Sequence, residues 1–275
     1  MSIRKLMSVA VIAAASLHIA GAASAQSTLD RIVQSRTLRC GVMLDYPPAG
    51  FRNPQNQPDG FDVAYCRDMA HALGVKPQII ETPSTERLPA IASNRIDVLI
   101  ASTSNTPQRA LTVAFSQPYV VYQDVVLTRN DTAIENFDGL KGRKIGGVTG
   151  STGEQAIIGF FRSWNNPAGN YTGYGSEAES YLALSQGKID GMIVGNAAAA
   201  ALIASGQFNN LVTMGLAPSP PDFCAIAVRR GDQEFLNWVN LFIWQQVRTG
   251  RYTALYNQYF GPGDAPSLAV PGVYY

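Results

Sequence analysis

The chain has 275 residues, of which 46% are hydrophobic and only 15% are charged, enough for one large domain or two of ordinary size with a well-filled core. Its 21 basic and 20 acidic residues nearly cancel, and their signs are mixed along the sequence. This balance argues against nucleic acid or an anionic membrane surface as a partner.

The first 25 residues have the pattern of an export signal. Arg4 and Lys5 precede an apolar stretch, and Ala23-Ser24-Ala25 forms a small-residue cleavage site. The stretch is short for a membrane span, and no later segment approaches about 18 uninterrupted apolar residues. We therefore expect residues 1–25 to be removed and the protein to be exported, most simply to a bacterial periplasm.

Cysteine and histidine are rare in this chain. Three cysteines in an exported protein allow at most one internal disulfide, and Cys40 and Cys66 fall in a predicted strand and the helix that follows it. The alternative is that these two and Cys224 are all buried thiols. Only His71 remains after signal cleavage, and no His or Cys cluster has metal-ligand spacing, so we expect no metal, no cofactor and no His-based triad.

The first half of the mature chain alternates between strand and helix patterns. Strands are predicted at 37–44, 77–81 and 96–101, and helices at 61–73 and 87–94. This alternation predicts a parallel α/β sheet, in which ligands bind at the carboxyl ends of the strands. Asp45-Tyr46 follows the first strand and residues 102–109 follow the third, so we expect both at one sheet edge.

A second α/β unit follows with the same logic. Its predicted strands are 142–148, 171–174 and 189–194, and its predicted helices are 155–164, 176–185 and 197–204. Two longer β-rich runs lie at 119–128 and 223–228, and a helical tail covers 235–259. Ser151 or Thr152 can cap the helix that begins near 155, whose free N–H groups then face an anion. A phosphate loop is excluded because the segment lacks a Gly-Lys-Ser/Thr ending.

The stretch 102–109, Ser-Thr-Ser-Asn-Thr-Pro-Gln-Arg, carries the most chemistry. Hydroxyls, free N–H groups and a guanidinium at the end of a buried strand are what a carboxylate-binding site needs. The alternative is a plain helix start, with Thr106 as N-cap, Pro107 at the first helical position and Arg109 in solvent.

Several motifs occur in a characteristic order. They are Gly-Phe-Asp-Val at 60–63, Thr-Pro-Gln-Arg at 106–109, Phe-Ser-Gln-Pro-Tyr at 115–119, Leu-Lys-Gly-Arg-Lys-Ile-Gly at 140–146, Gly-Ser-Thr-Gly-Glu at 150–154 and Tyr-Phe-Gly at 259–261. Over nearly its whole mature length, the chain resembles family 3 of the periplasmic solute-binding proteins, the polar amino acid type that serves ABC importers.

The resemblance implies a type II periplasmic binding protein fold, in which two α/β lobes are joined by two hinge strands and the ligand lies in the cleft. The hinge strands would be 119–128 and 223–228. Residues 26–122 and 224–275 would form lobe 1, and 123–223 would form lobe 2. Ligand would close the lobes, and an ABC transporter permease would sense the closure. We expect a monomer.

The resemblance also implies a carboxylate clamp. Arg109 would bind the ligand carboxylate bidentately, and the other ligand-binding positions would be Tyr46, Ser102, Ser104, Ser151, Thr152 and Asn196. Arg87 and Tyr119 are interpreted as scaffold, and the three tryptophans as core.

Two departures from the family pattern bear on the ligand. Members that bind amino acids usually place an acid just after the strand at 189–194 to hold the ammonium, whereas this chain has Gly195-Asn196. Members that read basic or amide side chains often carry Asp where this chain has Met43. An apolar or aromatic ligand, or a carboxylate without an amino group, is therefore favoured over a basic one. Acceptors for an ammonium remain open among Asp45, Glu81 and Asp222.

The prediction is thus a binding protein for a small carboxylate, without catalysis. One alternative is an enzyme on the same fold that resembles cyclohexadienyl dehydratase, which needs an acid to protonate a leaving hydroxyl. The missing acid after 189–194 counts against it. A second alternative is a periplasmic accessory or sensor protein that uses the fold to bind a partner.

Overall fold

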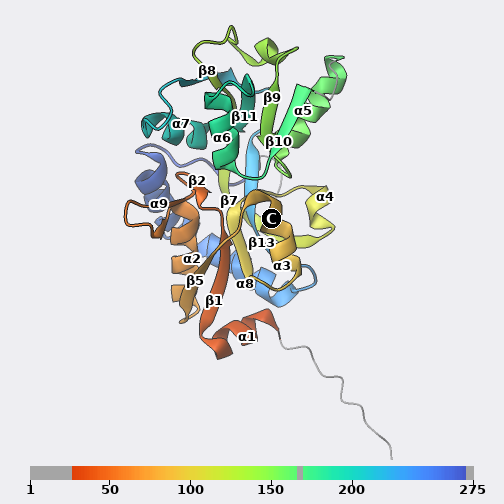
Figure 1. Cartoon of the computed structure of the whole chain (residues 1–275). Helices are drawn as coiled ribbons and strands as arrows, with labels where there is room; N and C mark the ends of the chain where they lie inside the picture. Colours follow the sequence, from red (N-terminus) through yellow and green to blue (C-terminus); the bar gives the residue numbers. More distant parts are fainter. Residues whose placement is uncertain (1–26, 166–169, 271–275) are drawn as a thin grey trace, which may run out of the picture.

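The computed structural model describes residues 27–165 and 170–270. Two mixed sheets lie one above the other along the long axis of the molecule, each with its own helices (Figure 1). We call the part built on one sheet the first lobe and the part built on the other the second lobe. The predicted export signal lies outside the described residues.

The first lobe is built on a five-stranded sheet with the order β5-β1-β6-β13-β7. These strands are β1 (Thr37–Val42), β5 (Lys76–Glu81), β6 (Val98–Ser104), β7 (Val113–Tyr122) and β13 (Asp222–Arg229). β1 pairs in parallel with β5 and β6, whereas β13 is antiparallel to both β6 and β7. A strand from the end of the chain thus completes a sheet begun by its start.

Helices cover both faces of this sheet. They are α1 (Thr28–Ser35), α2 (Phe61–Ala72), α3 (Arg87–Ala92), α4 (Pro107–Ala110), α8 (Gln233–Arg248) and α9 (Arg251–Phe260), with the short 3-10 turn η1 (Ser84–Glu86) before α3. Successive residues of β6 point to opposite faces, so Val98 and Ile100 join the core under α2 and α8 while Leu99 and Ala101 join the core under α3. Burial on both faces explains why this strand reads as a continuous apolar run.

The second lobe repeats this plan with the order β10-β9-β11-β8-β12. Its elements are β8 (Asp124–Arg129), η2 (Phe137–Leu140), β9 (Ile145–Val148), α5 (Thr152–Ser163), β10 (Tyr171–Tyr174), α6 (Glu177–Ser185), β11 (Gly191–Gly195), α7 (Asn196–Ala204) and β12 (Leu211–Leu216). Along β11, Met192 and Val194 pack with α6 and α7, whereas Ile193 packs with α5.

The chain passes between the lobes at two places. Gln123 separates β7 from β8, so the predicted run 119–128 is split between the sheets. The return passage is 217–221, ahead of β13 and not within it. Asp222 and Phe223, expected in lobe 2, pair with Tyr122 and Val121 of β7 in the first sheet.

Three local features differ from the sequence prediction. Asp45-Tyr46 is the first strand, β2, of a small antiparallel sheet with β3 (Gly50–Arg52) and β4 (Pro58–Asp59), where only turns were expected. The tail is two helices and not one, because Gly250 at φ 77° interrupts it between α8 and α9. Trp244 on α8 is 52% exposed, so it is not a core residue.

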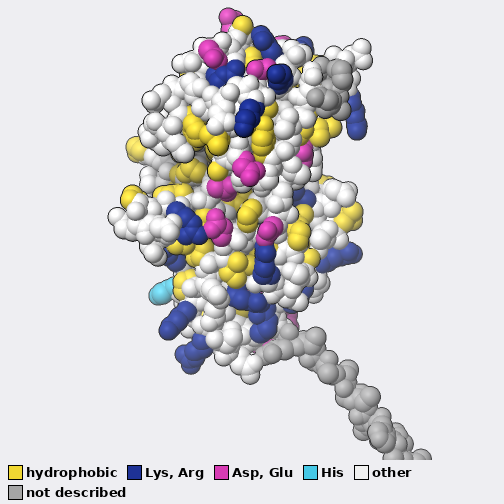
Figure 2. Space-filling model, viewed as in Figure 1, with side chains coloured by type: hydrophobic (Ala, Val, Ile, Leu, Met, Phe, Trp, Pro, Cys, Tyr) yellow, Lys and Arg dark blue, Asp and Glu magenta, His cyan; other side chains and the backbone are white. Residues whose placement is uncertain are grey.

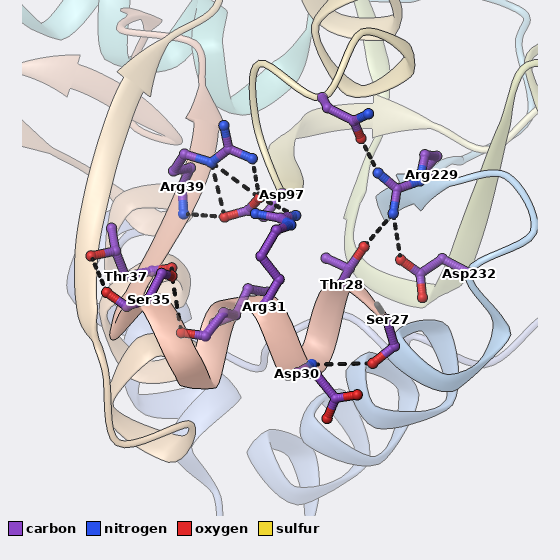
Figure 3. A network of polar contacts seen from close by, with 12 residues as sticks. Ser27, Thr28, Asp30, Arg31, Ser35, Thr37, Arg39, Asp97, Arg229 and Asp232 are labelled. Atoms are coloured by element: carbon purple, nitrogen blue, oxygen red, sulfur yellow. Dashed lines mark hydrogen bonds and ion pairs between the residues drawn. The ribbon is translucent and has the colours of Figure 1, made fainter. Parts of the chain in front are cut away.

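A disulfide and a buried ion-pair network hold the helices α2 and α1 on the first sheet. Of the two alternatives for the cysteines, the structure has the disulfide: Cys40 in β1 is bonded to Cys66 in α2. Cys224 is a free, buried thiol. Buried Asp97 accepts the backbone N–H and the guanidinium of Arg39 and forms an ion pair with Arg31 of α1 (Figure 3).

Candidate functional site

A cavity of about 550 Å³, including space open to solvent, lies between the two lobes. The first lobe contributes Met43, Tyr46, Arg87, Ser102, Ser104, Tyr122 and Asp222, and the second contributes Asp124, Val148, Ser151, Thr152, Gly153, Glu177, Met192, Ile193, Val194 and Gly195. Both lobes are therefore needed to form it.

Two hydroxyls at the carboxyl end of β6 face this cavity. Ser102 and Ser104 were expected after the strand, but β6 continues through Ser104 because Cys224 of β13 pairs with it. Ser104 Oγ donates to Asp222 Oδ2 at 2.7 Å and lies 3.0 Å from Thr152 Oγ1, so the Thr152 hydroxyl is the donor in that second bond. Ser104 thus joins the lobes across the cavity.

Ser102 has an unusual backbone. Its φ of 43° lies in the left-handed region, which costs a non-glycine residue about 1 kcal/mol. The backbone N–H of Ser102 donates to Tyr119 Oη at 2.9 Å, and Ser102 Oγ donates to Asp62 Oδ2 at 3.0 Å and lies 2.9 Å from Tyr122 Oη. Such strain at a cavity wall is typical of functional sites.

The wall of the second lobe begins at α5. Ser151 is the N-cap of this helix, since Ser151 Oγ accepts the N–H of Glu154 at 3.0 Å, and Thr152 is its first residue. Both residues line the cavity beside the positive end of a 12-residue helix. This arrangement favours an anionic group at that wall.

Two buried arginines lie close to this wall. Arg109 is 6% exposed; its Nη1 donates to Ser104 O at 3.0 Å and its Nη2 to Gly150 O, in the other lobe, at 2.7 Å. Arg109 does not line the main cavity but an adjoining depression, which it shares with Arg87. Thr106 caps the short helix α4 as the alternative interpretation foresaw, yet Arg109 is buried and not in solvent.

Arg87, interpreted as scaffold from the sequence, lines both the cavity and the depression. It is also 6% exposed, and its guanidinium donates to Ser84 Oγ at 2.7 Å and to Ala101 O at 3.1 Å. Burial lowers the pKa of Arg87, and it lowers that of Arg109 to about 10. Among the described residues, neither guanidinium has a carboxylate within ion-pair distance.

Three acids also line the cavity. Asp124 accepts from Ser219 Oγ at 3.0 Å, and burial followed by repulsion from Asp222 raises its pKa. Burial likewise raises the pKa of Asp222, although the hydrogen bond from Ser104 opposes the shift. Burial and then the charge of Asp45 raise the pKa of Glu177 to about 7. No ion pair to any of these three acids is found within the described part of the chain.

Tyr46 and Gly195 meet across the cavity. A Cβ added at Gly195 would lie 2.5 Å from Tyr46 Oη, so a side chain at this position collides with the tyrosine. Asn196 does not line the cavity; its Oδ1 accepts the N–H of Gln123 at 3.3 Å, at the first passage between the lobes. A further hydrogen bond joins the two lobes: the backbone N–H of Glu177 donates to Asp45 Oδ2 at 2.9 Å.

The structure therefore brings five of the seven predicted residues to the cavity and leaves Arg109 beside it and Asn196 at the passage. Sequence reasoning did not place four polar lining residues, Arg87, Tyr122, Asp124 and Glu177. Glu177 was noted only as an acid in the first turn of a helix. In the sequence, Asp124 could have been noticed as the only acid within the β-rich run 119–128, which passes from one lobe to the other.

On the face shown in Figure 2, acidic side chains gather where the lobes meet, and lysine and arginine dominate the end of the first lobe. Residues 27–165 and 170–270 contain no group of His, Cys, Asp and Glu arranged to hold a metal. Within the same residues, no helix combines the length and apolarity required to cross a membrane.

The fold and the interlobe cavity are those of a two-lobed binding protein of type II, and comparison with known proteins gives the family. The family model described as bacterial extracellular solute-binding proteins, family 3, matches residues 38–262. Because this match covers most of the chain, the chain belongs to this family, as its motifs predicted.

Individual relatives agree with this assignment. The L-cystine-binding protein TcyJ of Escherichia coli is 28% identical over 238 residues, which are 86% of this chain and 87% of that protein. The glutamine-binding protein GlnH of Bacillus subtilis is 27% identical over 241 residues, 86% and 85% of the two chains. Among solved structures, an ancestral amino acid-binding protein described as a precursor of cyclohexadienyl dehydratase superposes with a TM-score of 0.76, is 30% identical, and covers 85% of this chain and 100% of its own.

Proposed function

We propose that this protein is the periplasmic substrate-binding component of an ABC importer and that it holds an amino acid between its two lobes. The family and the relatives named above support the class of ligand. The observation that carries the proposal is the pair of buried arginines, Arg87 and Arg109, which have no carboxylate partner among the described residues. A buried guanidinium without a counter-ion favours an incoming carboxylate.

Hydroxyls complete the binding of the carboxylate in this proposal. Ser102 and Ser104 approach from the first lobe, and Ser151 and Thr152 approach from the start of α5 in the second. Arg109 already joins the lobes through its hydrogen bond to Gly150 O, so a ligand carboxylate near Arg109 would be contacted by both lobes. Closure of the lobes would then be the signal that a permease reads.

The acids of the cavity argue for an amino group on the ligand. The position after the predicted strand 189–194, where an acid was sought, is Gly195 at the end of β11, but Asp124 lies directly opposite Gly195 in the register of β8 and β11. Asp222 faces the same cavity from β13. We infer that these two carboxylates receive the ammonium, so a carboxylate without an amino group is the poorer ligand. Met43 and the apolar residues 192–194 provide a surface for an apolar or aromatic side chain.

Isothermal titration calorimetry tests the proposal with the proteinogenic amino acids and, for each one that binds, the same carboxylate lacking its amino group. We expect at least one amino acid to bind and its deaminated counterpart to bind at least tenfold more weakly. Arg109→Ala should weaken both members of the pair about 100-fold or more, because a desolvated charge loses its partner. Asp222→Asn should weaken only the amino form.

Asp138→Asn serves as the control, since Asp138 is an exposed acid outside the cavity. A panel in which no amino acid binds would refute the proposed ligand class. Unchanged affinity in Arg109→Ala would remove Arg109 from the site, and equal losses for both members of the pair in Asp222→Asn would remove the ammonium assignment. An accessory or sensor protein would bind none of these compounds.

A dehydratase is the second candidate, and Glu177 is the observation that favours it. A buried acid with a pKa raised to about 7 in the cavity is suited to protonate a leaving hydroxyl. We propose binding without catalysis because the named relatives are binding proteins. Incubation with prephenate or arogenate separates the two candidates: formation of an aromatic product that is lost in Glu177→Gln would establish the enzyme.

A further inference from the structure

A buried acid lies directly behind the cavity wall. Asp62, in the first turn of α2, is 1% exposed and does not line the cavity itself. Its Oδ1 accepts from Tyr119 Oη at 2.7 Å and its Oδ2 accepts from Ser102 Oγ at 3.0 Å. Within the described residues it has no cationic partner at ion-pair distance. Asp62 thus reaches the cavity only through Ser102.

The backbone at Ser102 depends on this group of side chains. The register of β6 and β13 shifts between the pairs Ala225–Thr103 and Ala227–Leu99, which leaves Ser102 outside the regular ladder. Its N–H bonds instead to Tyr119 Oη, which in turn donates to Asp62. The left-handed φ of Ser102 is therefore held by a chain of bonds that ends at Asp62.

The proton on Asp62 sets the direction of the bond to Ser102. When Asp62 is ionised it can only accept, so the Ser102 hydroxyl must point its hydrogen away from the cavity. When Asp62 is protonated it can donate to Ser102 Oγ, and the Ser102 hydrogen is then free to turn to Tyr122 Oη or toward the cavity. The same side chain then offers a donor where it previously offered only lone pairs.

We propose that Asp62 is a positioning residue for the ligand cavity, whose proton determines whether Ser102 can donate a hydrogen bond to a ligand carboxylate. This inference rests on the proposed function, because it takes the ligand to be a carboxylate. Affinity should consequently be higher when Asp62 is protonated, both because Ser102 donates and because a buried negative charge near the ligand is removed.

The electrostatic surroundings place this change near neutral pH. Burial raises the pKa of Asp62 to about 7, and the hydrogen bonds from Tyr119 and Ser102, followed by the charge of Arg87, oppose the shift. The titratable groups that interact with it from the neighbouring elements are Tyr65 on α2, Arg87 on α3, Tyr119 and Tyr122 on β7 and Cys224 on β13. Of these, only Arg87 carries a charge at neutral pH.

Two measurements test the proposal on the full mature chain. The first follows the side-chain carboxyl carbons of aspartate by NMR between pH 4 and 9 without any ligand, with Asp62→Asn identifying the signal of Asp62. We expect this signal to titrate between pH 6 and 8 and to shift in Ser102→Ala, which removes a bond to the ionised form. Titration below pH 5, or a signal that Ser102→Ala does not move, would overturn the coupling.

The second measurement is calorimetry at pH 6 and pH 8 with whichever proteinogenic amino acid of the panel binds most tightly. Wild-type protein and the surface control Asp138→Asn should bind at least threefold more tightly at pH 6. Asp62→Asn should lose that difference, and Ser102→Ala should reduce it to the part that comes from the charge of Asp62 alone. Glu177→Gln removes a cavity acid whose pKa is also raised to about 7, so a difference that survives in it does not come from Glu177.

The outcomes separate the two hypotheses. A pH difference that persists in Asp62→Asn, or one that disappears in Glu177→Gln alone, overturns the role of Asp62 while leaving the proposed function intact. If no amino acid binds at either pH, the proposed function fails and the carboxylate inference falls with it. The NMR titration still reports in that case whether Asp62 and Ser102 are coupled.

Discussion

Buried acids at single positions control how stability depends on pH. Burial raises the pKa values of Asp62 and Glu177 to about 7 in the folded chain, whereas unfolded carboxyls titrate near about 4. Between these pH values the folded state binds more protons than the unfolded state, so stability falls as pH rises. These residues thus oppose the usual gain in stability between acid and neutral pH.

We expect Asp62→Asn to remove much of this dependence. One pKa unit corresponds to about 1.4 kcal/mol, so the contribution of Asp62 is on the order of 4 kcal/mol between pH 4 and 7. Urea unfolding at pH 5 and pH 8 should show a smaller loss for Asp62→Asn than for wild-type protein. Asp138→Asn, at an exposed position, should follow wild-type. Parallel profiles for all three proteins would contradict the assignment.

At the scale of elements, the strongest link in the first lobe is the one between β1 and α2. The disulfide Cys40–Cys66 spans 26 positions, and closing a loop of that length stabilises a fold by about 3 kcal/mol. It also anchors α2, which carries Asp62 and packs on β1, β5 and β6. The second lobe holds no cysteine, so the effect is confined to the first.

The double variant Cys40→Ala, Cys66→Ala should therefore lose about 2–4 kcal/mol of unfolding free energy, measured with urea. Cys224→Ala is the matched control, because it removes a buried thiol without removing a cross-link. Thiol counting provides a direct check: wild-type protein should expose one reactive thiol on unfolding without reductant and three with it. Three thiols without reductant would show that the bridge does not form.

Most elements were predictable because their patterns are local, and the exceptions have several causes. The helix at 61–72 follows apolar periodicity and ends just before Gly74, and the strands at 37–42 and 76–81 were predicted to within two residues at each end. The extension of β6 through Ser104 arises from pairing with β13, which no local window contains. The small sheet at Asp45-Tyr46 is a local meander, and it was missed because its strands are very short and lie among Pro and Gly turn residues. The strand β12 had no strong pattern and was not predicted. The helix α1 was also not predicted, although Ser27 caps it and its apolar residues Leu29 and Ile32 pack on the same core.

The residues of the cavity also divide into those that local sequence could predict and those that it could not. Hydroxyls at the end of β6 and at the start of α5 could be predicted, since strand ends and helix starts are visible in sequence. The positions of Arg87, Asp124 and Glu177 could not, because they depend on how the two lobes face each other. Whether Arg109 points into the main cavity or beside it is also decided by that arrangement.

At the scale of the whole molecule, Tyr46 and Gly195 report on how closely the lobes approach. The backbone at Gly195 has φ −58°, which any residue adopts, so its only constraint is the Tyr46 hydroxyl opposite. Gly195→Ala should keep the lobes apart and weaken binding of an amino acid about tenfold or more, with little change in unfolding free energy. Small-angle X-ray scattering should show a larger radius of gyration in the presence of that amino acid.

Adding Tyr46→Phe to this variant provides the control. Loss of the hydroxyl makes room for the new methyl group, so the double variant should recover most of the affinity and the compact state. Tyr46→Phe alone should show how much the hydroxyl itself contributes. No recovery in the double variant would mean that Gly195 matters for a reason other than contact with Tyr46.

The place of β13 in the first sheet has a consequence for the order in which the chain can fold. Every strand of the second sheet lies between residues 124 and 216, whereas the first sheet needs residues 222–229 between β6 and β7 to be complete. During synthesis, the second lobe can therefore close while the first still lacks its inner strand. The lobe that begins the chain is the last to finish folding.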